Sequence, residues 1–100
     1  MFKGTTPTHT FTLDQDTNII KELKISYYQN DELVLVKRTA DCTISGNTIV
    51  TKLSQEDTFK FIGNANVMII IRVLTHSGDA LMTEPMYSAV RKCLDDEVLV

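Results

Sequence analysis

The sequence predicts an all-β domain, an immunoglobulin-like antiparallel β-sandwich of about seven strands with one short helical crossover. Three observations favour this fold class. Apolar and polar residues alternate in several short runs, which is typical of strands with one buried face. Turn-forming residues interrupt these runs about every eight to twelve residues. Tryptophan is absent, so we expect a core of Ile, Leu and Val, and β-branched residues favour strands. A small barrel is the alternative architecture.

The first half of the chain carries the signals for one strand and a hairpin. Residues 8–13 alternate strictly between threonine and larger side chains, which predicts a half-buried strand. The run 19–28 alternates in the same way, although its apolar spacing is also compatible with a helix. It leads through Asn30-Asp31, which tolerate left-handed backbone angles, into the apolar run 33–36. We therefore expect 19–28 and 33–36 to form a hairpin.

A second hairpin is predicted directly after the first. Residues 41–44 and 47–53 are rich in β-formers. They flank Ser45-Gly46, the strongest turn signal in the chain. The two runs should therefore pair as antiparallel strands.

A short helix is expected after residue 53, where the succession of strands and tight turns stops. Ser54 is able to cap a helical turn, and the acidic residues after it complement the helix dipole. The helix would carry Phe59 and Ile62 into the core while the chain crosses from one sheet to the other. Gly63-Asn64 would end it.

The most apolar run, 67–74, predicts a central strand covered on most of both faces, with a buried helix as the alternative. The turn at 76–79 closes this strand, and 80–83 begins the return arm. Pro85 cannot donate a hydrogen bond to a ladder. We therefore expect the arm to break there, at an edge or a bulge, before it resumes at 86–94.

Some boundaries and faces stay open at this level. We expect one domain over 1–100, with residues 1–6 and 95–100 as frayed ends. The last of these segments is acidic and then apolar, so it is alternatively a segment docked on a partner. The sequence does not fix which faces of 33–36 and 67–74 turn outward. An exposed apolar contact patch would lie there.

Composition excludes two classes of protein. The net charge is -3 and no run of Lys or Arg is long enough to form a face, so nucleic acid is not an expected partner. No stretch reaches the ~18 apolar residues that span a bilayer, and the start of the chain lacks the apolar segment of a signal peptide. We expect a soluble protein made in the cytoplasm, with no membrane partner.

No residue is predicted to be catalytic, and we do not expect an enzyme. The turn at 76–79 reads His-Ser-Gly-Asp, but neighbours in a tight turn cannot converge on one point as triad members do. His9 lies beside Phe11 on the apolar side of its strand, where a satisfied histidine is commoner than a ligand. Glu56 and Asp57 would form a carboxylate pair for acid/base chemistry only with a partner and a cleft, which nothing else suggests.

Metal and cofactor sites are not expected either. Asp14, Asp16 and Asn18 resemble the opening of a calcium loop, but Ile19 and Ile25 stand where that loop needs glycine and glutamate. We therefore predict a polar loop between strands. No glycine-rich phosphate cradle is present, and no small-molecule substrate is expected.

Cys42 and Cys93 lack the CxxC spacing of a zinc site. Two buried free thiols are the expected state. A disulfide remains open if the two strands that carry them are neighbours.

Five stretches together carry a family resemblance: TPTHTFTL at 6–13, LSQEDTFKF at 53–61, IRVLT at 71–75, SGDA at 77–80 and KCLDDEVL at 92–99. The chain resembles a group of small prophage-encoded proteins of Firmicutes and, more distantly, the N-terminal sandwich domain of phage baseplate upper proteins. The likeness spans nearly the whole chain, and it carries over no functional residue.

The resemblance implies a non-enzymatic structural or interaction protein, a tail- or baseplate-associated component present in several copies. Its partners would be other virion proteins or further copies of itself, and it would be virion-associated. The competing class is a free-standing phage-derived regulatory protein that binds and inhibits a host protein through the acidic tail or a loop end. A small hydrolase is a third class.

Overall fold

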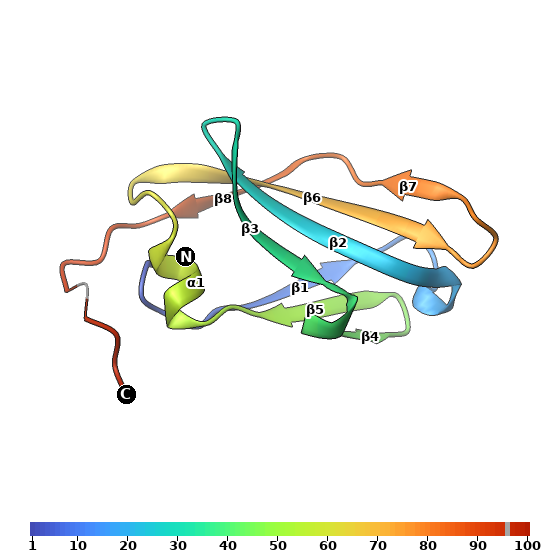
Figure 1. Cartoon of the computed structure of the whole chain (residues 1–100), viewed down its shortest axis with the longest axis horizontal. Helices are drawn as coiled ribbons and strands as arrows, with labels where there is room; N and C mark the ends of the chain where they lie inside the picture. The colour runs from blue at the N-terminus through green and yellow to red at the C-terminus, as the bar shows by residue number, and fades with distance from the viewer. Residues whose placement is uncertain (96) are drawn as a thin grey trace.

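Two antiparallel sheets pack face to face in the computed structural model, which describes residues 1–95 and 97–100 (Figure 1). The smaller sheet has the strand order β1-β5-β4. The larger has the order β3-β2-β6, and both β7 and β8 pair with the far edge of β6. The predicted all-β sandwich is confirmed. The elements are β1 (Thr8–Thr12), η1 (Thr17–Ile19), β2 (Ile20–Gln29), β3 (Glu32–Arg38), η2 (Thr39–Asp41), β4 (Cys42–Ser45), β5 (Thr48–Lys52), α1 (Gln55–Phe59), β6 (Ala65–Thr75), β7 (Ala80–Met82) and β8 (Met86–Val90).

Both predicted hairpins are present, and residues in the left-handed region close them. Asn30 and Asp31 have φ values of 51° and 63° at the turn between β2 and β3. Gly46, with φ 58°, lies in the turn between β4 and β5. Such backbone angles produce the turn twist that matches the twist of paired strands. The turn residues Asn30-Asp31 and Ser45-Gly46 therefore mark the two hairpins correctly in the sequence.

β6 is the central strand of the larger sheet. It pairs with β2 along one edge and with β7 and β8 along the other. The return arm breaks after Met82 and resumes at Met86, so Pro85 lies in the gap where the break is predicted. Both segments of the arm use the same edge of β6, which gives the larger sheet five strands.

The helix α1 forms where predicted, but its contribution to the core differs from the prediction. Ile62 is 54% exposed, whereas Phe61 is 1% exposed and lies 5.8 Å from the ring centroid of Tyr27. The helix ends at Phe59, which is only partly buried. Gln29 of β2 then holds the backbone N–H and C=O of Ile62 through its side-chain amide, so the Ile62 side chain turns outward. The expectation that Phe59 and Ile62 enter the core was therefore wrong in detail.

The hydrophobic core lies between the two sheets. Ile49 of the smaller sheet and Ile25, Tyr27 and Ile71 of the larger sheet have no exposed surface. Every buried side-chain nitrogen or oxygen in the described part of the chain has a hydrogen-bond partner. Within that part, no helix has the length and apolar character needed to cross a membrane.

Both chain ends hydrogen-bond to other parts of the domain. Residues 1–3, expected to fray, hydrogen-bond along the end of β8: Arg91 N–H donates to Met1 O at 2.7 Å, and Lys3 N–H donates to Arg91 O at 3.1 Å. Of the segment 95–100, residue 96 lies outside the described residues. Leu99 returns to α1, where its backbone N–H and C=O bond to the side chain of Gln55.

Candidate functional site

No other layer of the described structure covers the outer face of the larger sheet. Tyr27 and Ile69 are paired across β2 and β6 and are buried toward the smaller sheet. Side chains alternate along a strand, so the next residues, Tyr28 and Met68, point to the opposite side. This settles which face of 67–74 is exposed, a question that the sequence left open.

A row of four large side chains crosses this outer face. The strand register pairs Leu33 with Tyr28, Tyr28 with Met68, and Met68 with Tyr87. The row therefore spans β3, β2, β6 and β8 in order. Leu33 is 49% exposed and Tyr87 is 69% exposed, while the two middle side chains are half-buried between their neighbours.

A second row continues the apolar surface. Val36 pairs with Ser26, and Ser26 pairs with Ile70. The outer face of an antiparallel sheet is usually polar, so Leu, Val, Ile, Met and Tyr in adjoining rows mark a contact surface. We call this surface the apolar strip; it consists of Tyr28, Leu33, Val36, Met68, Ile70 and Tyr87.

Three cations form the next row on the same face. Lys24 pairs with Arg38 on one side and with Arg72 on the other, and we call these three residues the basic row. Adjacent strands lie about 4.8 Å apart, and like charges directly opposite each other are destabilising. The ion pair found among the described residues joins Lys37 to Asp57, so the basic row has no carboxylate partner there. A shallow hollow of about 260 Å³ lies over the row, and Glu22 contributes to its wall.

These cations lie far apart in the sequence, which is why no basic run is visible in it. Residues 24, 38 and 72 meet only because β3 and β6 flank β2 in this register. The apolar strip is easier to recognise in the sequence than the basic row. The runs 33–36 and 67–74 stay apolar on the side that should be polar, and these are the runs where the sequence predicted a contact patch.

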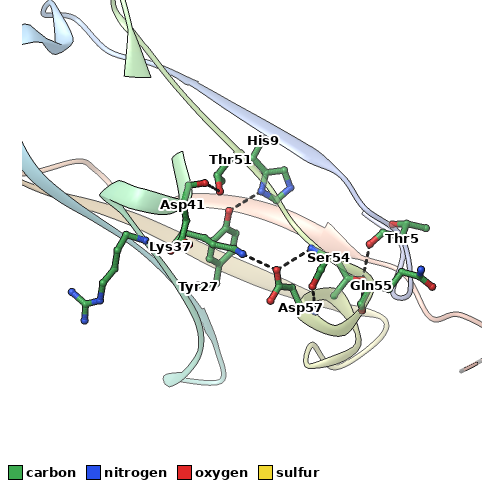
Figure 2. Close-up of polar contacts among 11 residues, drawn as sticks. Thr5, His9, Tyr27, Lys37, Asp41, Thr51, Ser54, Gln55 and Asp57 are labelled. Carbon is green, nitrogen blue, oxygen red and sulfur yellow. Dashed lines mark hydrogen bonds and ion pairs between the residues drawn. The ribbon is translucent and has the colours of Figure 1, made fainter. Parts of the chain in front are cut away.

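His9 forms a polar contact between the sheets rather than a ligand site. Its Nδ1 lies 2.8 Å from the hydroxyl of Tyr27 (Figure 2). Its ring meets that of Phe11 edge to face, with the two ring centroids 6.2 Å apart. Burial, with a smaller contribution from the positive N-terminus, lowers the pKa of His9. Burial also raises the pKa of Tyr27, so the phenol stays protonated. The pair joins β1 to β2 with both groups neutral.

The turn at 76–79 is a hairpin tip, as predicted. Thr75 Oγ1 and Ser77 Oγ are 2.9 Å apart, and Ser77 Oγ donates to Asp79 Oδ2 at 3.2 Å. The N–H of Asp79 donates to Thr75 Oγ1 at 3.0 Å. His76 is exposed, and its backbone N–H donates to Ile19 O. The serine and aspartate are therefore used to close the turn.

Asp57 is held by the start of α1 and by β3. Its Oδ2 accepts from Lys37 Nζ at 2.8 Å and from Ser54 N–H at 2.9 Å (Figure 2). Burial acts to raise the pKa of Asp57, but the bonds from Lys37 and Ser54 outweigh it and hold the pKa below its usual value. Glu56 is exposed beside it. Asp57 thus serves as a capping residue with an ion-pair partner.

The remaining polar candidates also have structural roles. Asp16 Oδ1 accepts from Asn18 N–H at 2.9 Å and caps η1, so the segment 14–18 is a polar loop between strands, as predicted. In residues 1–95 and 97–100, no group of His, Cys, Asp and Glu has the arrangement of a metal site.

Both cysteines are free, and both are partly exposed rather than buried. Cys93 lies beyond the end of β8, outside the core, which explains its exposure. Burial raises the pKa of the Cys42 thiol, although a hydrogen bond with Thr51 opposes this. Cys42 is therefore a protonated thiol near neutral pH.

The fold and this surface define a class: a small β-sandwich whose larger sheet has an outer face that is apolar along one strip and basic beside it. In comparisons with known proteins, no protein family, no curated protein and no solved structure matches the chain.

Proposed function

We propose that this chain is a non-enzymatic structural or interaction protein of phage origin, a tail- or baseplate-associated component that acts through protein–protein contacts. The phage origin rests on the resemblance of the stretches 6–13, 53–61, 71–75, 77–80 and 92–99. The mode of action rests on the apolar strip.

The observation that carries the proposal is the row of four large side chains on an uncovered sheet face. Fully burying one apolar side chain of this size stabilises a contact by roughly 1.5–3 kcal/mol. Leu33 and Tyr87 stand at the two ends of the row and retain about half or more of their exposed surface. A partner that covers the row therefore gains most of its energy from these two residues, while the half-buried Tyr28 and Met68 between them contribute less.

A second copy of the same chain is the partner that the charges favour. The hollow over the basic row holds three cations and one carboxylate, Glu22, so it attracts an acidic segment, and the chain as a whole carries a net charge of -3. The segment 94–100 combines the two required properties. Asp95 and Glu97 are exposed, Leu94 is 96% exposed and Leu99 is 69% exposed. Two hydrogen bonds to Gln55 attach the end of this segment to its own chain.

Such a contact joins two different surfaces, so it repeats from copy to copy. A heterologous contact of this kind builds rings when the rotation closes and filaments when it does not. Either outcome suits a component present in several copies. It also predicts that high salt weakens assembly, because the contribution of the basic row is screened.

Light scattering over a concentration series tests the proposal. We expect the wild-type chain to associate, and the double variant Leu33→Thr, Tyr87→Thr to remain a monomer. Ile62→Thr is the matched control, because Ile62 is 54% exposed but lies off this face. Arg72→Glu should weaken association, whereas Arg91→Glu, at an exposed position outside the basic row, should not.

A wild-type chain that stays monomeric at high concentration would contradict self-assembly. The remaining class would then be a regulatory protein that binds one host protein at a fixed ratio. If association survives deletion of residues 94–100, the apolar strip remains the proposed contact surface, but this segment is not what binds to it.

A further inference from the structure

The two layers of the sandwich differ in width, and part of the larger sheet has no strand beneath it. Leu23, Val73 and Leu81 form one inward-facing row across β2, β6 and β7. Leu23 is 4% exposed, Val73 is half-buried and Leu81 is 45% exposed. Exposure rises along the row because the smaller sheet ends before it reaches β7.

The smaller sheet ends at β1, whose outer edge is free. Leu13 N–H donates to Asn47 O at 2.7 Å, and Leu53 N–H donates to Pro7 O at 2.9 Å. These bonds extend the β1–β5 ladder, so the odd-numbered residues of β1 use their backbone groups toward β5. The backbone N–H and C=O groups of Thr8, Thr10 and Thr12 then point away from β5. All three residues are exposed.

A cavity of about 470 Å³ opens beside the end of this free edge. Its floor is apolar and includes Leu13, Ile71, Val73 and Leu81, while Thr12 lines it from β1. Three exposed acidic residues, Asp14, Asp16 and Glu84, also line the cavity, and we call them its acidic rim. The Lys37–Asp57 ion pair of the described part of the chain involves none of these three carboxylates.

We propose that the free edge of β1 accepts one extended segment of a partner protein by strand addition. The segment adds a fourth strand to the smaller sheet, and its backbone bonds to Thr10 and Thr12. An apolar side chain of the segment fills the cavity and covers Leu81. A lysine or arginine next to it pairs with the rim carboxylates Asp14 and Glu84.

The charge of the rim selects the occupant. The segment 94–100 of a second copy is apolar but acidic, so Asp14, Asp16 and Glu84 repel it. That segment suits the basic row instead. The edge of β1 therefore binds a basic, alternating segment from a different protein. This site is separate from the apolar strip, and its test does not depend on self-assembly.

A synthetic ten-residue peptide serves as the probe, with valine and threonine alternating and a lysine at two outward positions. A matched peptide carries glutamate in place of both lysines. We expect the lysine peptide to bind with saturable NMR shifts at the amides of Thr10 and Thr12. The glutamate peptide should bind about tenfold or more weakly, since contacts between like charges replace both lysine–carboxylate pairs.

Two substitutions of one residue test the strand addition itself. Thr10→Pro removes a backbone N–H that points away from β5, and an edge strand tolerates proline at such a position. This variant should bind the lysine peptide about tenfold or more weakly. Thr10→Val keeps the N–H and a β-branched side chain, so binding should be unchanged. Circular dichroism establishes that both variants are folded.

A charge exchange provides a test that does not rely on proline. Glu84→Lys should lower affinity for the lysine peptide and raise it for the glutamate peptide, and Leu81→Asp should weaken both. The proposal is overturned if the lysine peptide does not bind, if Thr10→Pro binds as Thr10→Val does, or if Glu84→Lys leaves the preference between the two peptides unchanged.

Discussion

Two polar pairs connect elements that are distant in the sequence. His9 and Tyr27 join the two sheets, and Lys37 and Asp57 join β3 to α1 (Figure 2). Burial lowers the pKa of His9 and raises that of Tyr27, whereas the bonds from Lys37 and Ser54 lower the pKa of Asp57 against the effect of burial. These shifts make the stability of the domain depend on pH, and each has its own sign.

Replacing Asp57 with alanine should lower the free energy of unfolding by about 1–2 kcal/mol near neutral pH, because a helix cap and a partly buried ion pair are lost together. The pKa of folded Asp57 lies below its usual value. Its contribution is therefore complete above the pKa of the unfolded chain and disappears as the pH falls through the folded pKa. Urea unfolding at several pH values measures this. Glu56→Ala, at an exposed neighbour, should cost little, and an undiminished loss at acidic pH would contradict the assignment.

His9 should cause a loss of stability in mildly acidic solution. Its pKa is lowered in the folded protein, so the unfolded chain takes up the proton first once the pH falls below about 6.5. The free energy of unfolding should decrease as pH falls from that value toward the folded pKa. His9→Gln keeps a hydrogen-bonding group near Tyr27 but cannot titrate, and it should flatten this dependence. An unchanged pH profile in His9→Gln would show that another group is responsible.

At the scale of elements, turn residues and caps fix where each strand and helix begins and ends. In the β2–β3 hairpin, Asn30 and Asp31 both adopt left-handed backbone angles. Asparagine tolerates this region well, and glycine does so at no steric cost. The second position of the turn is therefore not optimal for stability.

Asp31→Gly should raise the free energy of unfolding by roughly 0.5 kcal/mol, because Asn-Gly is the preferred pair for this turn. Asp31→Val should lower it by about 1 kcal/mol or more, since a β-branched side chain is strained at positive φ. Thermal unfolding followed by circular dichroism compares the two variants. If both variants changed stability in the same direction, the turn would not have the backbone geometry described above.

At the scale of the whole molecule, two layers of unequal width explain both binding proposals. The larger sheet exposes its outer face and, near β7, part of its inner face. β6 contributes side chains to both faces of the larger sheet. Ile71 points inward and has no exposed surface, whereas its neighbour Ile70 is half-buried on the outer face.

Ile71→Ala should therefore lower the free energy of unfolding by about 2–5 kcal/mol, whereas Ile70→Ala should cost about 1 kcal/mol or less. Urea denaturation of both variants measures the difference. Equal losses would contradict the assignment of the inner and outer faces of β6, and with it the position of the apolar strip.

Unfolding should not depend on reducing agent, because Cys42 and Cys93 are free thiols. We expect the same Tm with and without a reductant. A Tm that falls on reduction would show that the two residues are linked.

The sequence by itself determined the local features of this protein. The period of two in residues 8–13 and 19–28, the turn at Asn30-Asp31 and the cap at Ser54 each depend on residues close together in the chain. The structure has a strand, a hairpin or a helix start at each of these places. Local steric and hydrogen-bonding preferences were strong enough there to be recognised without the fold.

Only the tertiary structure decided which residues share a surface. The basic row, the row of four large side chains and the free edge of β1 all depend on strand register and on the widths of the two layers. The same long-range contacts placed Phe61 in the core and turned Ile62 outward. Register and layer order are set by packing between segments far apart in the chain, and a period of two within one strand carries no information about its neighbour.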